Sequence, residues 1–136
     1  MSYNNDTPIY KEKRDGFIPH PIEQGWIKHF GNGMTCKVWI HGSGTCHGEA
    51  YFYSDMIHRE DGPAWNNYDD LEGYKYREEY YIFGQRHRVD GPAYIMYDSN
   101  GHIVEKAYYL YDEKINVNND EEFEKYKLIV ELAGVK

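Results

Sequence analysis

Residues 58–65 read His-Arg-Glu-Asp-Gly-Pro-Ala-Trp, and residues 87–94 repeat the phrase as His-Arg-Val-Asp-Gly-Pro-Ala-Tyr. A phrase that recurs at a fixed spacing indicates a repeat architecture, in which each copy is one supersecondary unit. The pairs Tyr80-Tyr81 and Tyr108-Tyr109 recur with nearly the same spacing. The sequence therefore predicts a repeat protein.

Each unit reads as a strand, a turn and a second strand. The short run that starts with Pro-Ala-aromatic is unsuited to a helix because Pro stands at its start. A turn rich in Asp and Gly follows, and then a longer run rich in Tyr, Ile and Val. We predict a mainly β fold, an antiparallel β-hairpin repeat array in a single curved sheet. Its units lie at about 51–86 and 80–115, with a degenerate unit before residue 51.

The repeated phrase is predicted to form the corner that passes the chain from one hairpin to the next. Pro fixes φ and restricts the Gly before it to extended conformations. Arg and Asp two residues apart share a side of an extended backbone and could pair. Each His is expected to pack on a neighbouring Tyr or to bond a carbonyl. Recurrence in register favours a structural role over a site. The corner residues are His58, Arg59, Asp61, Gly62 and Pro63, then His87, Arg88, Asp90, Gly91 and Pro92.

The motif His-Arg-x-Asp-Gly-Pro-Ala, framed by Tyr-Tyr-x-x-Gly and Tyr-Asp-x-x-Gly, resembles a repeat of phage and giant-virus proteins of unassigned role. It is also similar to the β-hairpin repeats of the MORN type, although these units are longer and lack the Tyr-Glu-Gly-x-Trp core. The resemblance covers residues 51–115, about half of the chain. It implies an elongated array of antiparallel hairpins used for interaction, a viral source, and no catalytic residues.

Composition narrows the function classes. A chain of 136 residues suits one domain, and its net charge of −8 opposes direct binding to nucleic-acid backbones. The charge is ordinary for a cytosolic protein and also suits a basic protein partner. The sequence shows no signal peptide and no apolar stretch of membrane-spanning length, and its two cysteines suggest a reducing compartment. We expect a cytoplasmic protein, in the host cell if the source is viral.

The 15 tyrosines are concentrated in the repeat region. Tyr buries a large ring and keeps a hydroxyl in water, so most of these rings are expected to form the core of the sheet. Tyr in excess on one face would be a recognition surface. The candidates for such a surface are Tyr74, Tyr76, Tyr80, Tyr81, Tyr108 and Tyr109.

The N-terminal part is expected to hold a polar arm at 1–24, ordered only where Phe17 and Ile18 find a surface. The repeat domain spans 25–116 and starts with a hairpin that turns at Gly31-Asn32-Gly33. A second turn at Gly42-Ser43-Gly44 leads into a strand at 45–53. Within that strand, His47-Gly48-Glu49-Ala50 is interpreted as a degenerate corner.

This part also contains the only cluster of metal-ligand types, Cys36, His41, Cys46 and His47. Their spacing matches no known zinc finger, and strand alternation places Cys36 and His41 on opposite faces. The expected register puts Cys36 opposite residue 50, too far from Cys46 for a disulfide. We expect buried or free thiols, with no metal and no cofactor.

Residues 117–136 are predicted to form a helix of the same domain. Asn119 can cap it, Glu122 fits a capping box, and Gly134 ends it. The apolar stripe should cover the last strand edge; alternatively the helix, or the N-terminal arm, makes a homodimer contact. The stripe comprises Phe123, Tyr126, Leu128, Ile129, Val130, Leu132 and Ala133.

Three functions remain open. The preferred one is a non-enzymatic protein-interaction module, a small phage protein that binds and inhibits a host defence factor. The first alternative binds a small anionic ligand, such as a signalling nucleotide, through the His-Arg pairs. The second is an acidic DNA mimic, which needs two rows of carboxylates. Its candidates, Asp69, Asp70, Glu72, Glu78 and Glu79, are interleaved with Lys75 and Arg77. Catalysis is not expected, because an active site would break the repeat symmetry that His58 and His87 keep.

Overall fold

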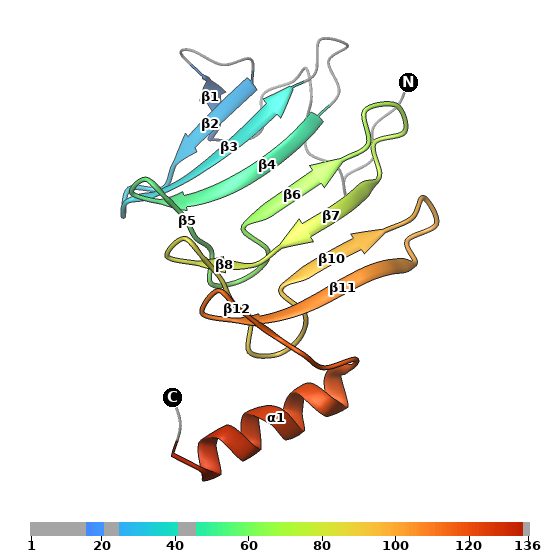
Figure 1. Cartoon of the computed structure of the whole chain (residues 1–136). Coiled ribbons are helices and arrows are strands. Elements are labelled where there is room, and N and C mark those ends of the chain that lie inside the picture. Colours follow the sequence, from blue (N-terminus) through green and yellow to red (C-terminus); the bar gives the residue numbers. More distant parts are fainter. Residues whose placement is uncertain (1–15, 21–24, 41–45, 135–136) are drawn as a thin grey trace.

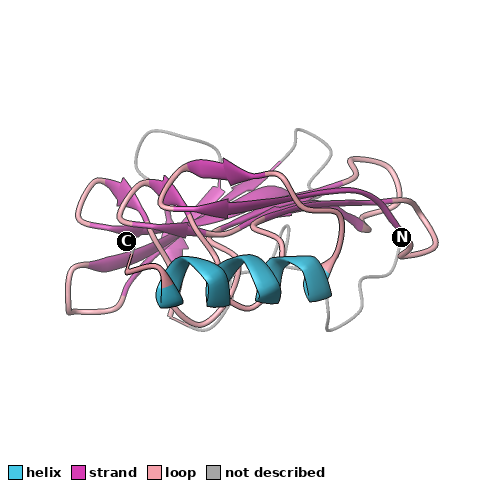
Figure 2. Ribbon diagram, turned by 60° about the horizontal axis from the view of Figure 1, so that its bottom comes forward, coloured by secondary structure: helices cyan, strands magenta, loops and turns pink. Residues whose placement is uncertain are grey.

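In the residues that it describes, the computed structural model shows a large open antiparallel sheet, one short two-stranded ladder and a C-terminal helix, which confirms the predicted fold class (Figure 1). The structure describes residues 16–20, 25–40 and 46–134. Most of the predicted arm and the Gly42-Ser43-Gly44 turn lie outside these residues. Figure 2 shows the strands as a layer with the helix running along it.

The main sheet has the strand order β1-β2-β3-β4-β6-β7-β10-β11-β12, with β5 also paired to β4, while β8 and β9 pair with each other. The strands are β1 (Ile18–Pro19), β2 (Gly25–His29), β3 (Met34–Ile40), β4 (Cys46–Tyr53), β5 (Met56–Ile57), β6 (Trp65–Tyr68), β7 (Lys75–Glu79), β8 (Tyr81–Ile82), β9 (Gln85–Arg86), β10 (Tyr94–Tyr97), β11 (Ile103–Leu110) and β12 (Glu113–Ile115). The helix α1 spans Asp120–Leu132.

The repeat is visible in the pairing. Along one edge of β4, β5 pairs with the end of the strand and β6 pairs with its middle. In the next unit β9 pairs with β8 and β10 pairs with β7 in the same arrangement. β12 pairs with the end of β11, and the chain then enters α1 where a third corner would follow. Two full units and the beginning of a third are therefore present.

The hairpin tips of the later units share a backbone conformation. Phe83 and Gly84 have φ of 45° and 82°, and Tyr111 and Asp112 have φ of 47° and 72°. Two successive left-handed residues are the pattern of a type I′ turn, whose twist matches that of the flanking strands. An aromatic residue in this conformation costs about 1–2 kcal/mol, so its presence at both tips requires a compensating contact.

The N-terminal strands follow the prediction except at one bulge. Ile40 pairs with Cys46, whereas Trp39 pairs with Gly48, so His47 is the extra residue in β4. Cys36 consequently lies opposite Tyr51 and not opposite residue 50.

The interpretation of His47-Gly48-Glu49-Ala50 as a degenerate corner is wrong, because these residues lie inside β4. No Pro interrupts the ladder there. Phe17 is buried and packs in the same cluster as Cys36 and Cys46, as expected of the part of the arm that finds a surface.

The helix begins and ends as predicted. The side chain of Asn119 accepts a hydrogen bond from the Glu122 N–H, and Gly134, with φ of 71°, follows the C-cap. The Glu122 carboxylate accepts from the N–H of Asn118, one residue before the bond of a standard capping box.

The stripe packs only in part. Phe123 is buried against the end of the sheet, whereas Leu128, Ile129 and Leu132 are exposed. The expectation that the whole stripe covers the sheet is therefore wrong.

Candidate functional site

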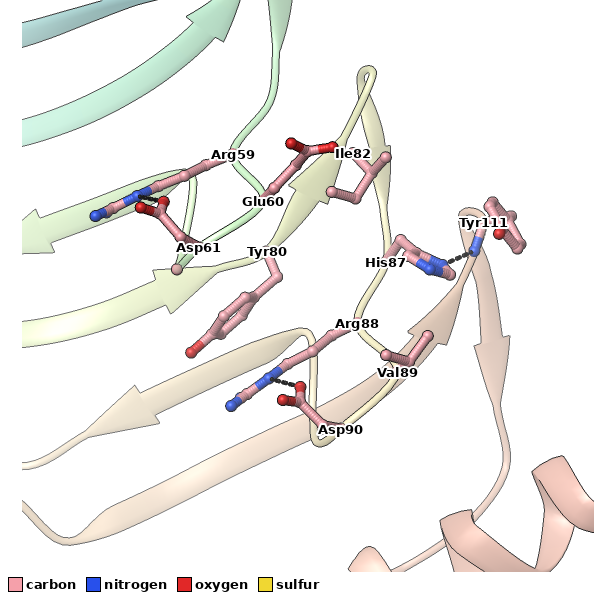
Figure 3. A pocket seen from close by; sticks show the side chains of 11 residues that line it. Arg59, Glu60, Asp61, Tyr80, Ile82, His87, Arg88, Val89, Asp90 and Tyr111 are labelled. Atoms are coloured by element: carbon pink, nitrogen blue, oxygen red, sulfur yellow. Dashed lines mark hydrogen bonds and ion pairs between the residues drawn. The ribbon is translucent and has the colours of Figure 1, made fainter.

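The two corners have the same geometry (Figure 3). The Nε of Arg59 donates to Oδ1 of Asp61 at 2.9 Å, and Arg88 donates to Asp90 at the same distance. In each corner Nη1 also donates to the carbonyl of the corner proline, at 3.2 and 3.1 Å. The hydrogen bond from Arg59 holds the pKa of the Asp61 carboxyl below its usual value. The ion pairs expected from the two-residue spacing are thus formed.

The corner glycines make room for these guanidinium groups. A Cβ at Gly62 would lie 3.1 Å from the guanidinium carbon of Arg59, and a Cβ at Gly91 would lie 3.1 Å from that of Arg88. Contacts this short require the neighbour to move. The Gly of each Asp-Gly-Pro is therefore needed for close packing of the arginine.

Each arginine also covers a tyrosine ring, and together they form a Tyr–Arg ladder. The guanidinium of Arg59 lies 4.0 Å from the ring centre of Tyr51, and that of Arg88 lies 4.0 Å from Tyr80. In the third unit the matching ring is Tyr108, and Phe123 of α1 lies 4.8 Å from it. The helix thus replaces the missing third arginine and ends the ladder.

The corner histidines connect successive units. Nδ1 of His58 accepts a hydrogen bond from the N–H of Phe83 at 2.8 Å, and Nδ1 of His87 accepts from that of Tyr111 at 3.0 Å. The imidazoles stack on the same aromatic residues, with ring centres 4.2 and 4.0 Å apart. Packing on a neighbouring Tyr was one of the two expectations, and His87 meets it at Tyr111, whereas His58 stacks on Phe83. The alternative was a bond to a carbonyl, but Nδ1 accepts from a backbone N–H instead.

These contacts compensate for the left-handed backbone at Phe83 and Tyr111. They also hold His58 and His87 at two different corners. An accepting Nδ1 carries no proton, and burial lowers the pKa of His87, which favours that neutral form. His58 lines one groove and His87 lines another. The two imidazoles do not meet in one pocket, so an acid–base pair between them is not formed.

Two grooves lie beside the corners, one repeat apart. Groove 1 has a volume of about 570 Å³ and groove 2 about 470 Å³. The equivalent residues Tyr80 and Tyr51 line them, and Glu60 lies at both. Groove 1 is lined by Arg59, Glu60, Asp61, Gly62, Tyr80, Ile82, His87, Arg88, Val89, Asp90 and Tyr111. Groove 2 is lined by Phe30, Asn32, Met34, Tyr51, His58, Arg59, Glu60 and Asp61.

A row of exposed apolar side chains borders the grooves, and we call it the tip ridge. It consists of Phe30, Tyr53, Met56, Phe83 and Tyr111. They come from successive hairpin turns, which gather at one end of the sheet, on the left in Figure 1. Phe83 is 50% and Tyr111 67% exposed, and the ring of Phe83 contacts that of Tyr53 at 5.8 Å.

The tip ridge was not among the sequence candidates. One sequence feature could have predicted it. Both units have an aromatic residue, Phe83 or Tyr111, at a turn position where a two-residue hairpin turn favours Gly or Asn.

The six candidate tyrosines do not form one surface. Tyr108 is 1% exposed and belongs to the core, so its assignment to a recognition surface is wrong. The ring of Tyr80 is covered by Arg88, the hydroxyl of Tyr81 donates to Glu79, and Arg86 lies over Tyr109. Tyr74 and Tyr76 lie in a different hollow of about 370 Å³, next to the β6–β7 turn.

The remaining sequence candidates find little support. Cys36 and Cys46 are buried in one cluster and are not joined in a disulfide, and His41 lies outside the described residues. Among the residues that the structure describes, no three His, Cys, Asp or Glu side chains are placed to hold a metal ion. Within the same part of the chain, no helix has the length and apolar character to cross a bilayer.

The proposed rows of carboxylates are also broken. Glu79 is buried and accepts from Arg86 at 2.6 Å, while Glu78 accepts from the Tyr97 hydroxyl. Neither carboxylate is presented freely at the surface. Comparison of the chain with protein-family models, with curated proteins and with solved structures gives no match.

Proposed function

We propose that this protein is a non-enzymatic protein-binding module whose contact surface is the tip ridge with the two grooves beside it. The observation that carries the proposal is the gathering of exposed apolar side chains from successive turns at one end of the sheet. Interfaces are enriched in Tyr, Phe and Met at their centre, with polar groups around them. Clustered exposed apolar side chains with polar groups around them often mark an interaction site.

The charges at the surface support a basic partner. The carboxylates of Asp61 and Asp90 are 86% and 79% exposed at the grooves, and the whole chain carries a net charge of −8. A partner with a basic and apolar surface complements them. In the phage setting that the repeat motif implies, this partner is a host protein in the cytoplasm, a defence factor that binding would inhibit.

The geometry favours a protein partner over a small anion. Each corner arginine already donates to a carboxylate and to a carbonyl. An anionic ligand would have to displace Asp61 or Asp90 from its guanidinium or bind beside that carboxylate. A thermal-shift panel of nucleotides tests this, and stabilisation by one of them would favour the anion binder.

The ridge is tested by a paired substitution. The double variant Phe83→Asn and Tyr111→Asn removes two exposed rings, and Asn tolerates the left-handed turn conformation. We expect a partner to co-purify with the wild-type protein from the cells in which the protein occurs. The double variant should not retain this partner, while its circular dichroism spectrum still shows a folded sheet. Leu71→Ser, at an exposed turn at the other end of the sheet, is the matched control.

Equal recovery of the partner by all three proteins would overturn the role of the ridge. The retained protein is identified by mass spectrometry and then mixed in purified form with wild type and variants. That step separates direct binding from recovery through a third component.

A further inference from the structure

We propose that the partner segment binds as a polyproline II helix that lies across the ends of the strands, with residues three positions apart entering groove 2 and groove 1. This inference rests on the proposed protein-binding function and adds the conformation and the residue spacing of what is bound. Three observations carry it: the spacing of the grooves, their charge and the end of the ladder at α1.

The spacing follows from the sheet. Groove 2 contains Tyr51 of β4, and groove 1 contains Tyr80 at the end of β7. β6 is the one strand between β4 and β7, so equivalent points of the two grooves are two strand separations apart, about 9.6 Å. A polyproline II helix has three residues per turn and rises about 9.3 Å per turn, so every third side chain points the same way at this spacing.

Other peptide conformations do not fit this spacing as well. Along a β-strand, side chains on one face are about 6.7 Å or about 13 Å apart, and neither value matches. On an α-helix, side chains of one face recur at i+3, i+4 and i+7, so two side chains about 10.5 Å apart have others between them, and the helix is itself about 10–12 Å wide. Polyproline II segments are recognised elsewhere by aromatic grooves of this kind, because they need little ordering on binding.

The groove chemistry selects cationic side chains. Glu60 is exposed at both grooves, and Asp61 lines both as well. Asp90 adds a third carboxylate at groove 1. Asp61 and Asp90 are each paired with a corner arginine, but their side chains are 86% and 79% exposed and can accept from a partner as well. A Lys or Arg side chain of the partner can therefore lay its apolar stem in the groove, beside the tyrosine whose ring face is covered by Arg59 or Arg88, and place its charge at Glu60. The prolines between would lie against the neighbouring apolar side chains Ile82 and Val89.

The ladder limits the number of such positions to two. The third tyrosine, Tyr108, is covered by Phe123 and is 1% exposed. A third cationic residue at the same spacing thus finds no equivalent groove on the described part of the chain.

Synthetic peptides test the spacing directly. The probe is dye-labelled Pro-Pro-Arg-Pro-Pro-Arg-Pro-Pro, and the composition-matched control is Pro-Arg-Pro-Pro-Pro-Arg-Pro-Pro, with arginines four apart. Binding to the full chain is measured by fluorescence anisotropy at moderate salt. We expect the three-residue spacing to bind about tenfold more tightly, because two grooves are engaged together. Extending the probe by one further Pro-Pro-Arg unit should leave its affinity per site unchanged.

Two charge variants show whether the grooves are responsible. Glu60→Gln should weaken binding of the three-spaced peptide several-fold. Glu72→Gln, the same change in the exposed β6–β7 turn at the other end of the sheet, should not. Equal affinity for the two peptides, no binding of either, or equal effects of the two variants would overturn the inference.

The result is separable from that of the ridge. If Phe83→Asn with Tyr111→Asn abolishes capture of a partner and the peptides are not distinguished, the protein-binding role stands and the polyproline II inference fails. If the peptides are distinguished and capture is unaffected by the double variant, the assignment of the ridge fails and the groove spacing stands.

Discussion

Nδ1 of His58 accepts a hydrogen bond from the backbone N–H of Phe83, at 2.8 Å, across the boundary between one repeat and the next. His58 is 3% exposed and its ring also stacks on that of Phe83, so one side chain supplies both the acceptor and the packing surface for the following hairpin tip. His87 does the same for Tyr111 in a more open position. Each corner histidine therefore connects its own unit to the hairpin tip of the following unit.

Substitution of the acceptor tests this connection. His58→Phe keeps an aromatic ring but leaves the Phe83 N–H without its acceptor, which costs about 1–3 kcal/mol for a buried donor. We expect a loss of that size in the free energy of unfolding measured in urea. His87→Phe should cost less, because water reaches its site more readily. His102→Phe, at an exposed position, is the control, and an equal loss there would argue against a role for the bond.

Stability should also depend on the charge of His87. Burial lowers its pKa in the folded protein relative to about 6.5 in the unfolded chain, so below that pH the unfolded state binds more protons. The contribution of this group is complete above pH of about 6.5 and is lost as the pH falls through the folded-state pKa. Unfolding free energies of wild type and His87→Phe between pH 7.5 and 5 should therefore converge toward the acidic end. Parallel curves would contradict the neutral, accepting imidazole.

The close contact between glycine and guanidinium can be tested by a double-mutant cycle. Gly62→Ala places a methyl group 3.1 Å from the guanidinium carbon of Arg59, which must then move away from Asp61 and Tyr51. We expect a destabilisation of about 1–3 kcal/mol. The same substitution in an Arg59→Ala background should cost clearly less, since the obstructing group is gone. Additive effects would show that the glycine is needed for another reason.

The helix should be stabilised by its N-terminal half alone. Phe123→Ala removes a buried ring from Tyr108 and Ile115 and should cost about 3–5 kcal/mol. Leu128→Ala and Leu132→Ala truncate exposed side chains and should each change the unfolding free energy by less than about 0.5 kcal/mol. Thermal unfolding followed by circular dichroism distinguishes the two cases. A large loss at Leu132 would show that the exposed stripe is covered in solution.

The sequence predicted what depends on local chemistry or on exact repetition. The corners follow from Pro and Gly at fixed positions, and the helix start follows from Asn119, whose side chain bonds within the next turn. Repetition also predicted the antiparallel hairpins, because two copies of one phrase must fold alike.

The errors all involve contacts between distant segments. The bulge at His47 depends on how β4 pairs with β3, and no residue type in this part of the sequence predicts it. The burial of Tyr108 depends on Phe123, which belongs to another element. The tip ridge was missed because Phe83 and Tyr111 are the last residues of the Tyr-, Ile- and Val-rich runs that were predicted as strands, 74–83 and 102–111. In the structure the corner histidines hold both residues at the turns.

At Tyr108 the ring of Phe123 occupies the place that an arginine guanidinium has in the two earlier units, and this limits how the repeat array can grow. Every earlier unit presents a face on which another unit can be built, and the helix occupies that face with a ring that belongs to no repeat. The helix thus ends the repeat array, and the number of units depends on the unit after which the helix follows. A further copy of the second unit inserted ahead of it should fold in register and give the molecule one more groove.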